Sequence, residues 1–595
     1  MYMRLSYIRL CLILAACWSF AVLPAKESDP ADNLSEAKQL NLGGDLQKIM
    51  KEQKGLSRMY PLLFREDDTE LEISELIKDL EPYRNKRIAK INFVSRDLFT
   101  APSEAASSGL VSRVVKLGNT LHPKIQERLI REQLFFAEGD SLDPEYLLGN
   151  LQYLYDKSLF SELAFEIEST EDDEITIDII TREKFFLQFG ATSISRDKYS
   201  FRIGNRNLFG TGYALENTLH ADIQDLWPIG WESSLSNHNI LGSFLQGNIH
   251  VTHVPGQKQF DCQIQRPFIF PVFDYSGGGD FSTSKVYPPQ DSVSVTKTEA
   301  GAWLARNFDL FEFPRYAYAA LSINQDWYEL RPYSDAENGM PWQKSFFALG
   351  ALAITQSSYR YLPRVSSVLD NDYLPVGYLF ELYGGADLGE YINRPFTGVH
   401  GSFSIFPNHD QYIYIKSALE GFWSEEGVEE GVFALEPGYI SQTLNLGDIK
   451  ARTFINARYI RSRRMLQTQS LSLRSNPFYR GKKDLSGTNL FQLSLEEDLS
   501  LPISLLGFQV NTFAFADLAI MEDKRRDTDT KNSLFYQGIG IRLSNPSLIW
   551  DFFEFYFSVN QSPQSRPGLN VGLRLSSAIQ LDGFKGRRPQ RYELN

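Results

Sequence analysis

Pairing between an arginine and a carboxylate is the chemistry that this sequence offers most clearly. Arg480 and Gly481 lie in a long basic connection that precedes a strand-like segment beginning at Asn489. In that segment Glu496 shares one face with polar neighbours, while leucine and phenylalanine side chains occupy the other face. A guanidinium can bind a carboxylate through two parallel hydrogen bonds, and the pair is strongest where water is partly excluded. The chain therefore offers a candidate lock between a loop and a strand face.

The motifs that would indicate catalysis are missing from the sequence. It contains no GxSxG nucleophile motif, no GxxxxGK[ST] phosphate-binding loop and no HExxH zinc motif. Its 7 histidines are scattered, and no cluster of Cys and His has the spacing of metal ligands. We therefore expect no enzyme activity, no cofactor and no metal. The formal net charge of −14 argues against nucleic acid as a partner.

The elements that would position these residues are short segments of alternating apolar and polar residues, which fill residues 184–595. The most regular is Gly568–Leu581, where every second residue from Leu569 to Leu575 is apolar. A period of two places the two sets of side chains on opposite faces of a sheet. Such a run behind an export signal predicts a mainly β fold, a transmembrane antiparallel β-barrel with lipid outside and a polar lumen.

An export signal is predicted at residues 1–25. Arg4 and Arg9 precede an apolar stretch, and Leu-Pro-Ala ends it. A lipobox ending at Cys17 is the alternative, although the apolar stretch continues beyond that residue. Cys262 is then the one cysteine of the exported chain, so the fold does not depend on an intramolecular disulfide.

Two regions separate the signal from the barrel. Residues 26–85 are polar and charged, and they predict a periplasmic helical extension with a helix from Thr69 to Leu80. Residues 86–183 predict a compact α/β unit with the order β-α-α-β-β. Its expected elements are a strand at 87–95, a helix at 122–136 with Pro123 in its first turn, a helix opened by Asp143 and Pro144, and strands at 161–169 and 174–183.

This α/β unit resembles a POTRA domain, the periplasmic module of the Omp85 (BamA/TamA) superfamily. The resemblance rests on the order of elements, on Glu138-Gly139-Asp140 between the helices and on Leu159-Phe160 before the second strand. The segment Asn207–Gly212 also matches the NxxGxG turn of that superfamily. Its glycines suit a tight connection that needs positive φ or a close backbone approach.

The basic connection resembles the Omp85 signature in which an RG[F/Y] loop folds back into the barrel and its arginine meets a Glu and an Asp. Carried over by position, the resemblance implies a lumenal loop lock made of Arg480, Gly481, Glu496 and Asp517. Alternation supports an inward Glu496. Asp517 has the parity of Phe513 and Phe515, so its inward position rests on the resemblance. Lys482 replaces the aromatic residue of the motif, and Arg-Gly in a basic loop is otherwise ordinary surface chemistry.

The number of strands is less certain than their pattern. Fifteen alternating segments precede Arg480 and five follow it. The superfamily pattern is sixteen strands with five after the corresponding loop, so we expect about 16 strands, with weak candidates near 273–286 and 395–406 forming loop hairpins. A larger barrel is the alternative.

The resemblance implies an outer-membrane protein that inserts polypeptides into the membrane or transports them across it, with its POTRA domain in the periplasm. Extended clients would bind along a strand edge, either 174–181 or 162–169. Outer-membrane lipid and periplasmic accessory proteins are the other expected partners. Two alternatives stay open: a two-partner secretion pore for a dedicated substrate, with a plug helix from residues 26–85, and a passive porin or structural barrel.

Overall fold

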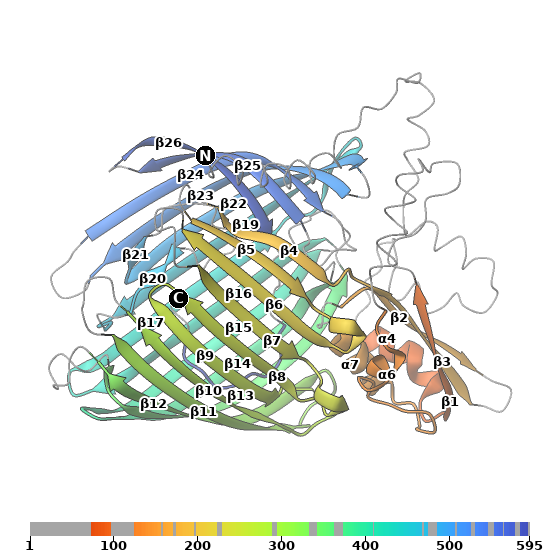
Figure 1. Ribbon diagram of the computed structural model, residues 1–595. Helices are drawn as coiled ribbons and strands as arrows, with labels where there is room; N and C mark the ends of the chain where they lie inside the picture. The colour runs from red at the N-terminus through yellow and green to blue at the C-terminus, as the bar shows by residue number, and fades with distance from the viewer. Residues whose placement is uncertain are drawn as a thin grey trace, which may run out of the picture. The chain divides into compact units, whose positions relative to one another are not determined.

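The computed structural model describes residues 73–96 and 124–592 with short gaps (Figure 1). The gaps are residues 156–158, 170–173, 195–197, 223–228, 270, 288–293, 332–341, 362–372, 409, 467–468, 474–484, 506–507, 525–529, 545–551, 563–564 and 577–582. The predicted signal, the predicted helix start at Thr69, Arg480 and Gly481 all lie outside the described residues. Of the predicted extension, α4 (Ile73–Leu80) and η2 (Glu81–Tyr83) are described.

The α/β unit has the element order β-α-α-β-β. Its elements are β1 (Ile88–Arg96), α6 (Glu127–Arg131), α7 (Pro144–Tyr155), β2 (Phe160–Ser169) and β3 (Ile175–Glu183). The three strands form one sheet in the order β1-β3-β2, with β1 parallel to β3 and β2 antiparallel to it. β3 is the central strand, and its alternating side chains Ile175, Ile177 and Ile179 are fully buried on one face of the sheet.

The two helices of this unit differ in how well the sequence predicted them. α7 begins at Pro144 as expected, and the Asp143 carboxylate accepts a hydrogen bond from the Glu145 N–H at 2.9 Å. The first helix is much shorter than the predicted span of 122–136. Its N-terminal side is extended at residues 124–126, and beyond it the Asn150 side chain bonds the main chain of residues 133 and 135, which ends the helix.

The barrel begins three residues after β3 and consists of long antiparallel strands. They are β4 (Leu187–Ile194), β5 (Lys198–Asn205), β6 (Tyr213–Asp222), β7 (Gly230–Asn237), β8 (Gln246–Val254), β9 (Gln257–Arg266), β10 (Tyr275–Val286), β11 (Val295–Phe308), β12 (Arg315–Leu330), β13 (Ser345–Tyr361), β14 (Tyr373–Gly389), β15 (Asn393–Asn408), β16 (Gln411–Ser424), β17 (Gly427–Ile440), β19 (Ile449–Arg463), β22 (Asn489–Leu505), β23 (Phe508–Asp523), β24 (Thr530–Ser544), β25 (Phe552–Ser562) and β26 (Ser565–Ser576). In the strand order β26 adjoins β4, so the sheet returns to its first strand.

Three short strands complete the described sheet structure. β18 (Leu444–Leu446) continues the position of β17 beside β19. β20 (Leu471–Ser472) and β21 (Ser486–Gly487) pair with each other within the connection that carries the Arg480 motif. No described helix is both long and apolar enough to cross a membrane.

The expectation of about 16 strands is wrong, because twenty long strands form the barrel within the described residues. Fifteen of them precede Arg480 and five follow it, so every alternating segment counted in the sequence is a strand. The two weak candidates are β10 and β15, each paired on both sides. β10 contains the glycine run Gly277–Gly279. A Cβ atom at Gly278 would lie 2.6 Å from the Ile264 carbonyl oxygen, so the glycine permits a close backbone approach.

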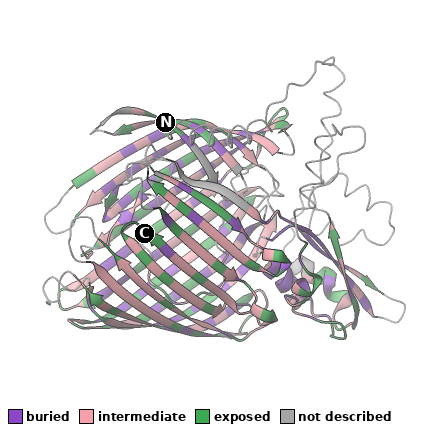
Figure 2. Ribbon diagram, viewed as in Figure 1, coloured by how far each residue is buried: buried purple, intermediate pink, exposed green. Residues whose placement is uncertain are grey.

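Side chains alternate between the two faces of the barrel, which gives the banded pattern along the strands in Figure 2. In β14, Phe380 and Leu382 are exposed on the outer face, while Leu379, Glu381 and Tyr383 are buried on the inner face. The last strand follows the same rule, with Leu569 74% exposed. The predicted alternation is therefore confirmed, and the exposed aliphatic and aromatic side chains give the barrel an apolar outer surface.

The antiparallel order assigns each loop to one end of the barrel. We call the end at which β4 starts the proximal end, because the α/β unit joins the barrel there, and the opposite end the distal end. When the long strands are counted from β4 as the first, every odd-numbered strand of this count begins at the proximal end and every even-numbered strand ends there. By this count β14 is the eleventh strand and β17 the fourteenth. The connection between β19 and β22, which carries Arg480, is therefore a distal loop, whereas the chain leaves β26 at the proximal end.

The NxxGxG segment forms a tight proximal turn at η3 (Leu208–Gly210). Gly210 and Gly212 have φ of +74° and +77°, and the Asn207 side chain accepts a hydrogen bond from the Gly212 N–H at 2.7 Å. A Cβ atom at Gly210 would lie 2.7 Å from the Lys124 carbonyl oxygen. Both reasons expected for these glycines, positive φ and close approach, are therefore confirmed.

A second turn at η4 (Ile240–Gly242) repeats this construction. Asn239 accepts a hydrogen bond from the Phe244 N–H at 2.6 Å, and Gly242 has a φ of +72°. The Asn239 amide also donates to the Glu132 carbonyl at 3.0 Å, just after α6. The two turns thus approach the same α6 segment of the α/β unit.

Candidate functional site

One buried arginine organises the inner wall formed by β22–β25. Arg542 on β24 is 0% exposed and forms ion pairs with three carboxylates. We call the arginine and these three carboxylates the Arg542 cluster. Its contacts are Nη2–Oε1 of Glu496 at 2.8 Å, Nη1–Oδ2 of Asp498 at 3.0 Å, and Nη2–Oε1 of Glu554 at 2.5 Å. All three carboxylates are almost fully buried. Such short, charge-assisted bonds satisfy groups that could not otherwise be held away from water.

The strand register explains how one guanidinium reaches three strands. Arg542 lies directly opposite Glu554 of β25. Glu496 and Asp498 lie two strands away on β22, so the arginine must cross β23. It does so over Phe513, with its Cζ atom 4.4 Å from the ring centroid. Gly540 lies opposite Phe513 and leaves room for the ring, because a Cβ atom there would come within 2.5 Å of it.

The structure places Glu496 and Asp517 on the same inner wall. Both are buried, and they lie on the paired strands β22 and β23, Glu496 opposite Phe515 and Asp517 opposite Ser494. The inward Glu496 was predicted from alternation. Alternation gave no support for an inward Asp517, because inward aromatic residues were not expected. Phe513 and Phe515 are buried on the same face, so the lumen wall is more aromatic than the sequence analysis assumed.

The pairing of Arg480 with these two carboxylates stays a prediction, because Arg480 and Gly481 lie outside the described residues. Arg542, which the sequence analysis did not single out, forms an ion pair with Glu496. A signal for it was present. Arg542 alternates with Ile541 and Ile539, which are exposed on the outer face, so period two already placed a charged residue in the lumen.

A second charged region occupies the wall from β14 to β17. Glu381, Glu420 and Glu430 are each at most 5% exposed. Within the wall, Tyr318 Oη donates to Glu381 at 2.7 Å, the His400 ring lies 2.7 Å from Glu420, and Arg394 lies 2.8 Å from Glu430. We call the three glutamates, Glu381, Glu420 and Glu430, the acidic wall. Within the described ranges no group of His, Cys, Asp and Glu is placed to hold a metal ion.

Aromatic residues line the lumen beside the acidic wall. Their buried members include Phe268, Trp303, Tyr316, Tyr318, Tyr383, Phe396 and Phe422. The Phe268 and Trp303 rings are stacked with centroids 5.7 Å apart, and the Phe268 and Tyr318 centroids are 4.7 Å apart. The wall therefore combines carboxylates with flat apolar surfaces, a combination that suits arginine and extended peptide.

In the α/β unit, the outer edge of β1 is already covered. Ile88 donates its N–H to the Asp140 carbonyl at 2.9 Å and accepts from the Gly139 N–H at 2.8 Å. The Ile91 N–H donates to the Glu138 carboxylate at 3.1 Å. This hydrogen bond, with help from Arg131, lowers the pKa of Glu138 below its ordinary value. The Glu138-Gly139-Asp140 motif thus caps one edge of the sheet.

The other edge of the sheet is β2. The strand order β1-β3-β2 makes β3 the central strand, so the predicted docking edge at 174–181 is wrong. The alternative edge, 162–169, lies on β2 at the border of the sheet in that order. An edge strand of this kind is the usual place where an extended peptide adds to a sheet.

Comparisons with known proteins found similar solved structures, and these carry no argument about the function of this chain. No family model and no curated protein sequence matches this chain. Similar solved structures are BamA from Haemophilus ducreyi lacking POTRA domains 1–3 (12% identity, TM-score 0.33, 92% of this chain and 96% of that chain), CdiB from Acinetobacter baumannii (12%, 0.40, 92% and 99%) and the siderophore receptor PirA from Pseudomonas aeruginosa (8%, 0.29, 84% and 83%). The strand pairing itself defines the class: a β-barrel protein with an N-terminal α/β unit.

Proposed function

We propose that this chain is an outer-membrane barrel that inserts polypeptides into the membrane or transports them across it, with the α/β unit acting as a POTRA domain in the periplasm. The observation that carries the proposal is the joining of a three-stranded sheet, with β2 at its border, to a barrel by a three-residue connection between β3 and β4. The α/β unit that would bind a peptide and the barrel that would receive it belong to one chain, so a bound peptide would be held close to the barrel. The apolar outer surface of the barrel supports its place in a membrane.

The proposed docking site for an extended client is the edge strand β2. β1 is covered by the Glu138-Gly139-Asp140 turn, and β3 is central, so β2 is the edge strand of the described sheet. Main-chain hydrogen bonds would supply the affinity, and they are largely independent of client sequence. Periplasmic accessory proteins are further proposed partners, and they could use the same edge.

We also propose that the distal loop folds into the lumen and that Arg480 binds Glu496 and Asp517. The support is geometric, because both carboxylates are buried on one wall of paired strands. The Arg542 cluster holds three carboxylates around one guanidinium, so a second cation from the loop would lower their mutual repulsion. The loop would then contribute to both the fold of the lumen and the passage through it.

Site-specific photo-cross-linking in cells tests the docking edge. A photoreactive residue in place of the exposed Glu168 on β2 should capture unfolded outer-membrane polypeptides. The matched control is the same residue in place of Val94, which is exposed on β1. Equal capture at both positions, or capture at Val94 alone, would overturn the β2 assignment.

Depletion of the protein separates the three functional classes. Loss of many outer-membrane proteins together supports an assembly factor. Loss of one secreted product supports a dedicated secretion pore. If neither changes while small-solute uptake falls, the barrel is a porin and the proposal fails.

A further inference from the structure

The chain returns into the barrel lumen after its last strand. Residues 583–592, which we call the C-terminal segment, have no helix or strand and contact side chains of strands from β10 to β17. The segment therefore occupies the lumen beside the acidic wall.

Side chains of the wall hold the main chain of this segment. The Thr355 hydroxyl donates to the Phe584 carbonyl, the Tyr316 hydroxyl accepts from the Gly586 N–H (3.0 Å), the Ser322 hydroxyl donates to the Pro589 carbonyl (2.9 Å), and the Glu420 carboxylate accepts from the Tyr592 N–H (3.0 Å). These four contacts are spread along the whole segment. Recognition of main-chain groups at such regular intervals is how proteins hold an extended peptide.

The arginines of the segment pair with carboxylates of the wall. Arg587 binds Glu381 (Nη2–Oε2 2.5 Å), Arg588 binds Asp280, and Arg591 binds Glu430 (Nη2–Oε2 3.1 Å) and lies 3.8 Å from Glu420. The three glutamates are the acidic wall itself. A buried carboxylate is stable only with a partner, so the wall and the segment complement each other in charge.

Aromatic contacts seat the segment between these ion pairs. The Phe584 side chain is buried in the aromatic cluster that contains Phe268. Gly586 passes directly over the same ring, where a Cβ atom would come within 2.4 Å of Phe268. The Arg591 guanidinium lies 4.6 Å from the Phe422 ring centroid. Phe584, Gly586 and Arg591 thus each meet an aromatic side chain of the wall.

The segment runs along the lumen from the proximal toward the distal end. Phe584 lies beside Gly377, near the proximal start of β14, whereas Arg591 reaches Glu430, near the distal start of β17. Ten extended residues span at most about 33–36 Å, which is comparable to the apolar height of about 25 Å of a membrane barrel. A segment of this length can therefore follow most of the pore.

We propose that the wall from β10 to β17 is a binding site for an extended, arginine-rich polypeptide, and that the chain's own C-terminal segment occupies it as a displaceable plug. A twenty-stranded barrel lies between porins, which leave an aqueous channel, and larger barrels, whose lumen is plugged. The inference concerns the lumen alone and goes beyond the proposed function, since it holds equally for an assembly factor, a secretion pore and a porin.

Removal of the plug is tested by single-channel recording of the purified full-length protein in planar lipid bilayers. Deletion of residues 583–595 should raise the conductance several-fold. The variant Arg587→Glu/Arg588→Glu/Arg591→Glu keeps the chain length and should open the pore to a similar extent. Gel mobility with and without heating checks that each barrel is folded. Wild-type conductance from a folded deletion protein overturns the plug, and if the deletion protein does not fold, the triple variant decides.

Rebinding in solution tests the site itself. A synthetic peptide with the sequence GFKGRRPQRY, residues 583–592, should block the open deletion protein and leave the wild type unaffected. A peptide with glutamate in place of each arginine is the control and should not block. Absence of block, or equal block by both peptides, overturns a charge-specific binding site.

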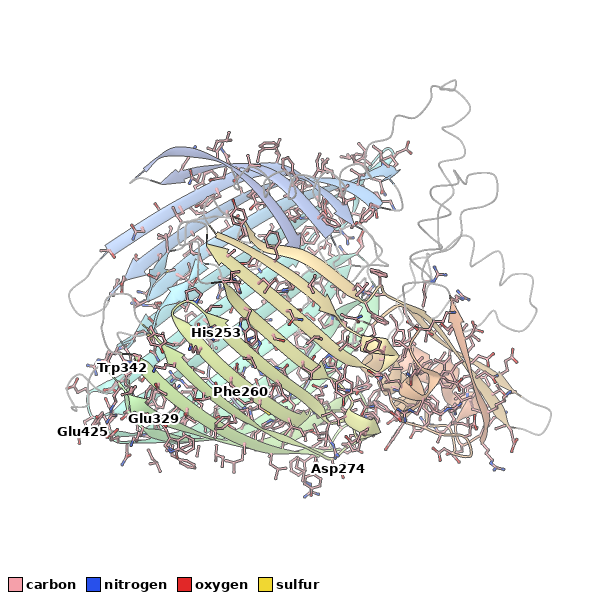
Figure 3. All side chains as sticks on the ribbon, viewed as in Figure 1. His253, Phe260, Asp274, Glu329, Trp342 and Glu425 are labelled. Carbon is pink, nitrogen blue, oxygen red and sulfur yellow. The ribbon has the colours of Figure 1, made fainter. Side chains whose placement is uncertain are left out.

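Wall variants in the deletion background locate the site. Glu381→Gln should weaken the block about tenfold, because it removes the buried carboxylate that Arg587 binds. The matched control is Glu329→Gln, an exposed position on β12, labelled in Figure 3. Equal weakening by the two variants would show that the peptide responds to the overall charge of the barrel and would overturn the assignment to this wall.

Discussion

Removal of the buried guanidinium of Arg542 should destabilise the barrel severely. In Arg542→Met, the carboxylates of Glu496, Asp498 and Glu554 would lose hydrogen bonds of 2.5–3.0 Å. Breaking a buried ion pair by removing one partner costs about 3–5 kcal/mol, because uncompensated charge stays in the interior. The four hydrogen bonds share one guanidinium, so their separate contributions do not add and the estimate is not multiplied by four.

The assay is equilibrium unfolding by urea of the barrel in lipid vesicles, followed by tryptophan fluorescence. With a slope of about 2–3 kcal/mol per M, a loss of about 3–5 kcal/mol lowers the midpoint by about 1–2.5 M. The matched control is Arg202→Met, which removes a cross-strand arginine whose pair with Glu216 is 43% and 38% exposed. An exposed pair contributes at most about 1 kcal/mol, so this control should change the midpoint little.

A partial rescue separates charge from packing. Adding Glu554→Gln to Arg542→Met removes one of the three stranded charges and should recover part of the lost stability. The reasoning is refuted if Arg542→Met unfolds at the wild-type urea concentration, or if it is no more destabilising than Arg202→Met. A rescue variant that is less stable than the single variant would show that the loss arises from the shape of the side chain and not from buried charge.

Three further predictions concern the loop lock, the tight turn and the capped edge. If Arg480 binds Asp517, a double-mutant cycle with alanine at both positions should give a coupling of about 1–3 kcal/mol in the same urea assay, and additivity would contradict the lock. Gly210→Ala should cost about 1–3 kcal/mol, because the position combines a φ of +74° with a close backbone contact, whereas Gly427→Ala, at a φ of +104° in open space, should cost less. A lowered pKa at Glu138 means that its stabilising effect is present above the unfolded pKa and is lost as the pH falls through the folded pKa. Hydrogen exchange of β1, compared between wild type and Glu138→Gln, should therefore converge at acid pH, and a ratio that does not change with pH would contradict this assignment.

The outer face of the barrel and the order of the α/β unit were predictable because both depend on local periodicity. Alternation at Leu569 and its neighbours reports which side chains face outward, and this needs no knowledge of strand partners. Asp143 and Pro144 likewise mark a helix start through bonds within a few residues. The inward position of Glu496 follows from the same parity. The predictions from the sequence failed where the role of a residue depends on a partner that is distant in the chain.

The number of strands shows how a correct local pattern was misjudged. The twenty segments were all visible, yet β10, which contains Gly277–Gly279, was expected to be a loop hairpin so that the count would fall to about 16. Gly277 and Gly278 are explained by the strands on either side, because a Cβ atom would lie 2.8 Å from the Trp303 carbonyl oxygen on β11 and 2.6 Å from the Ile264 carbonyl oxygen on β9. A count borrowed from the resembling superfamily therefore overrode a count that the chain itself supported.

What the sequence by itself determined is the kind of protein: a barrel of alternating strands, a β-α-α-β-β unit before it, glycine turns that need positive φ, and a charged lumen. The tertiary structure alone decided which charges meet. Arg542 reaches Glu496 across an intervening strand, and the arginines of the C-terminal segment reach glutamates some 160 to 210 residues away in the chain. Periodicity tells which face a side chain occupies. It cannot tell which neighbour faces it, because that is set by the register of strands and by a segment that returns through the lumen.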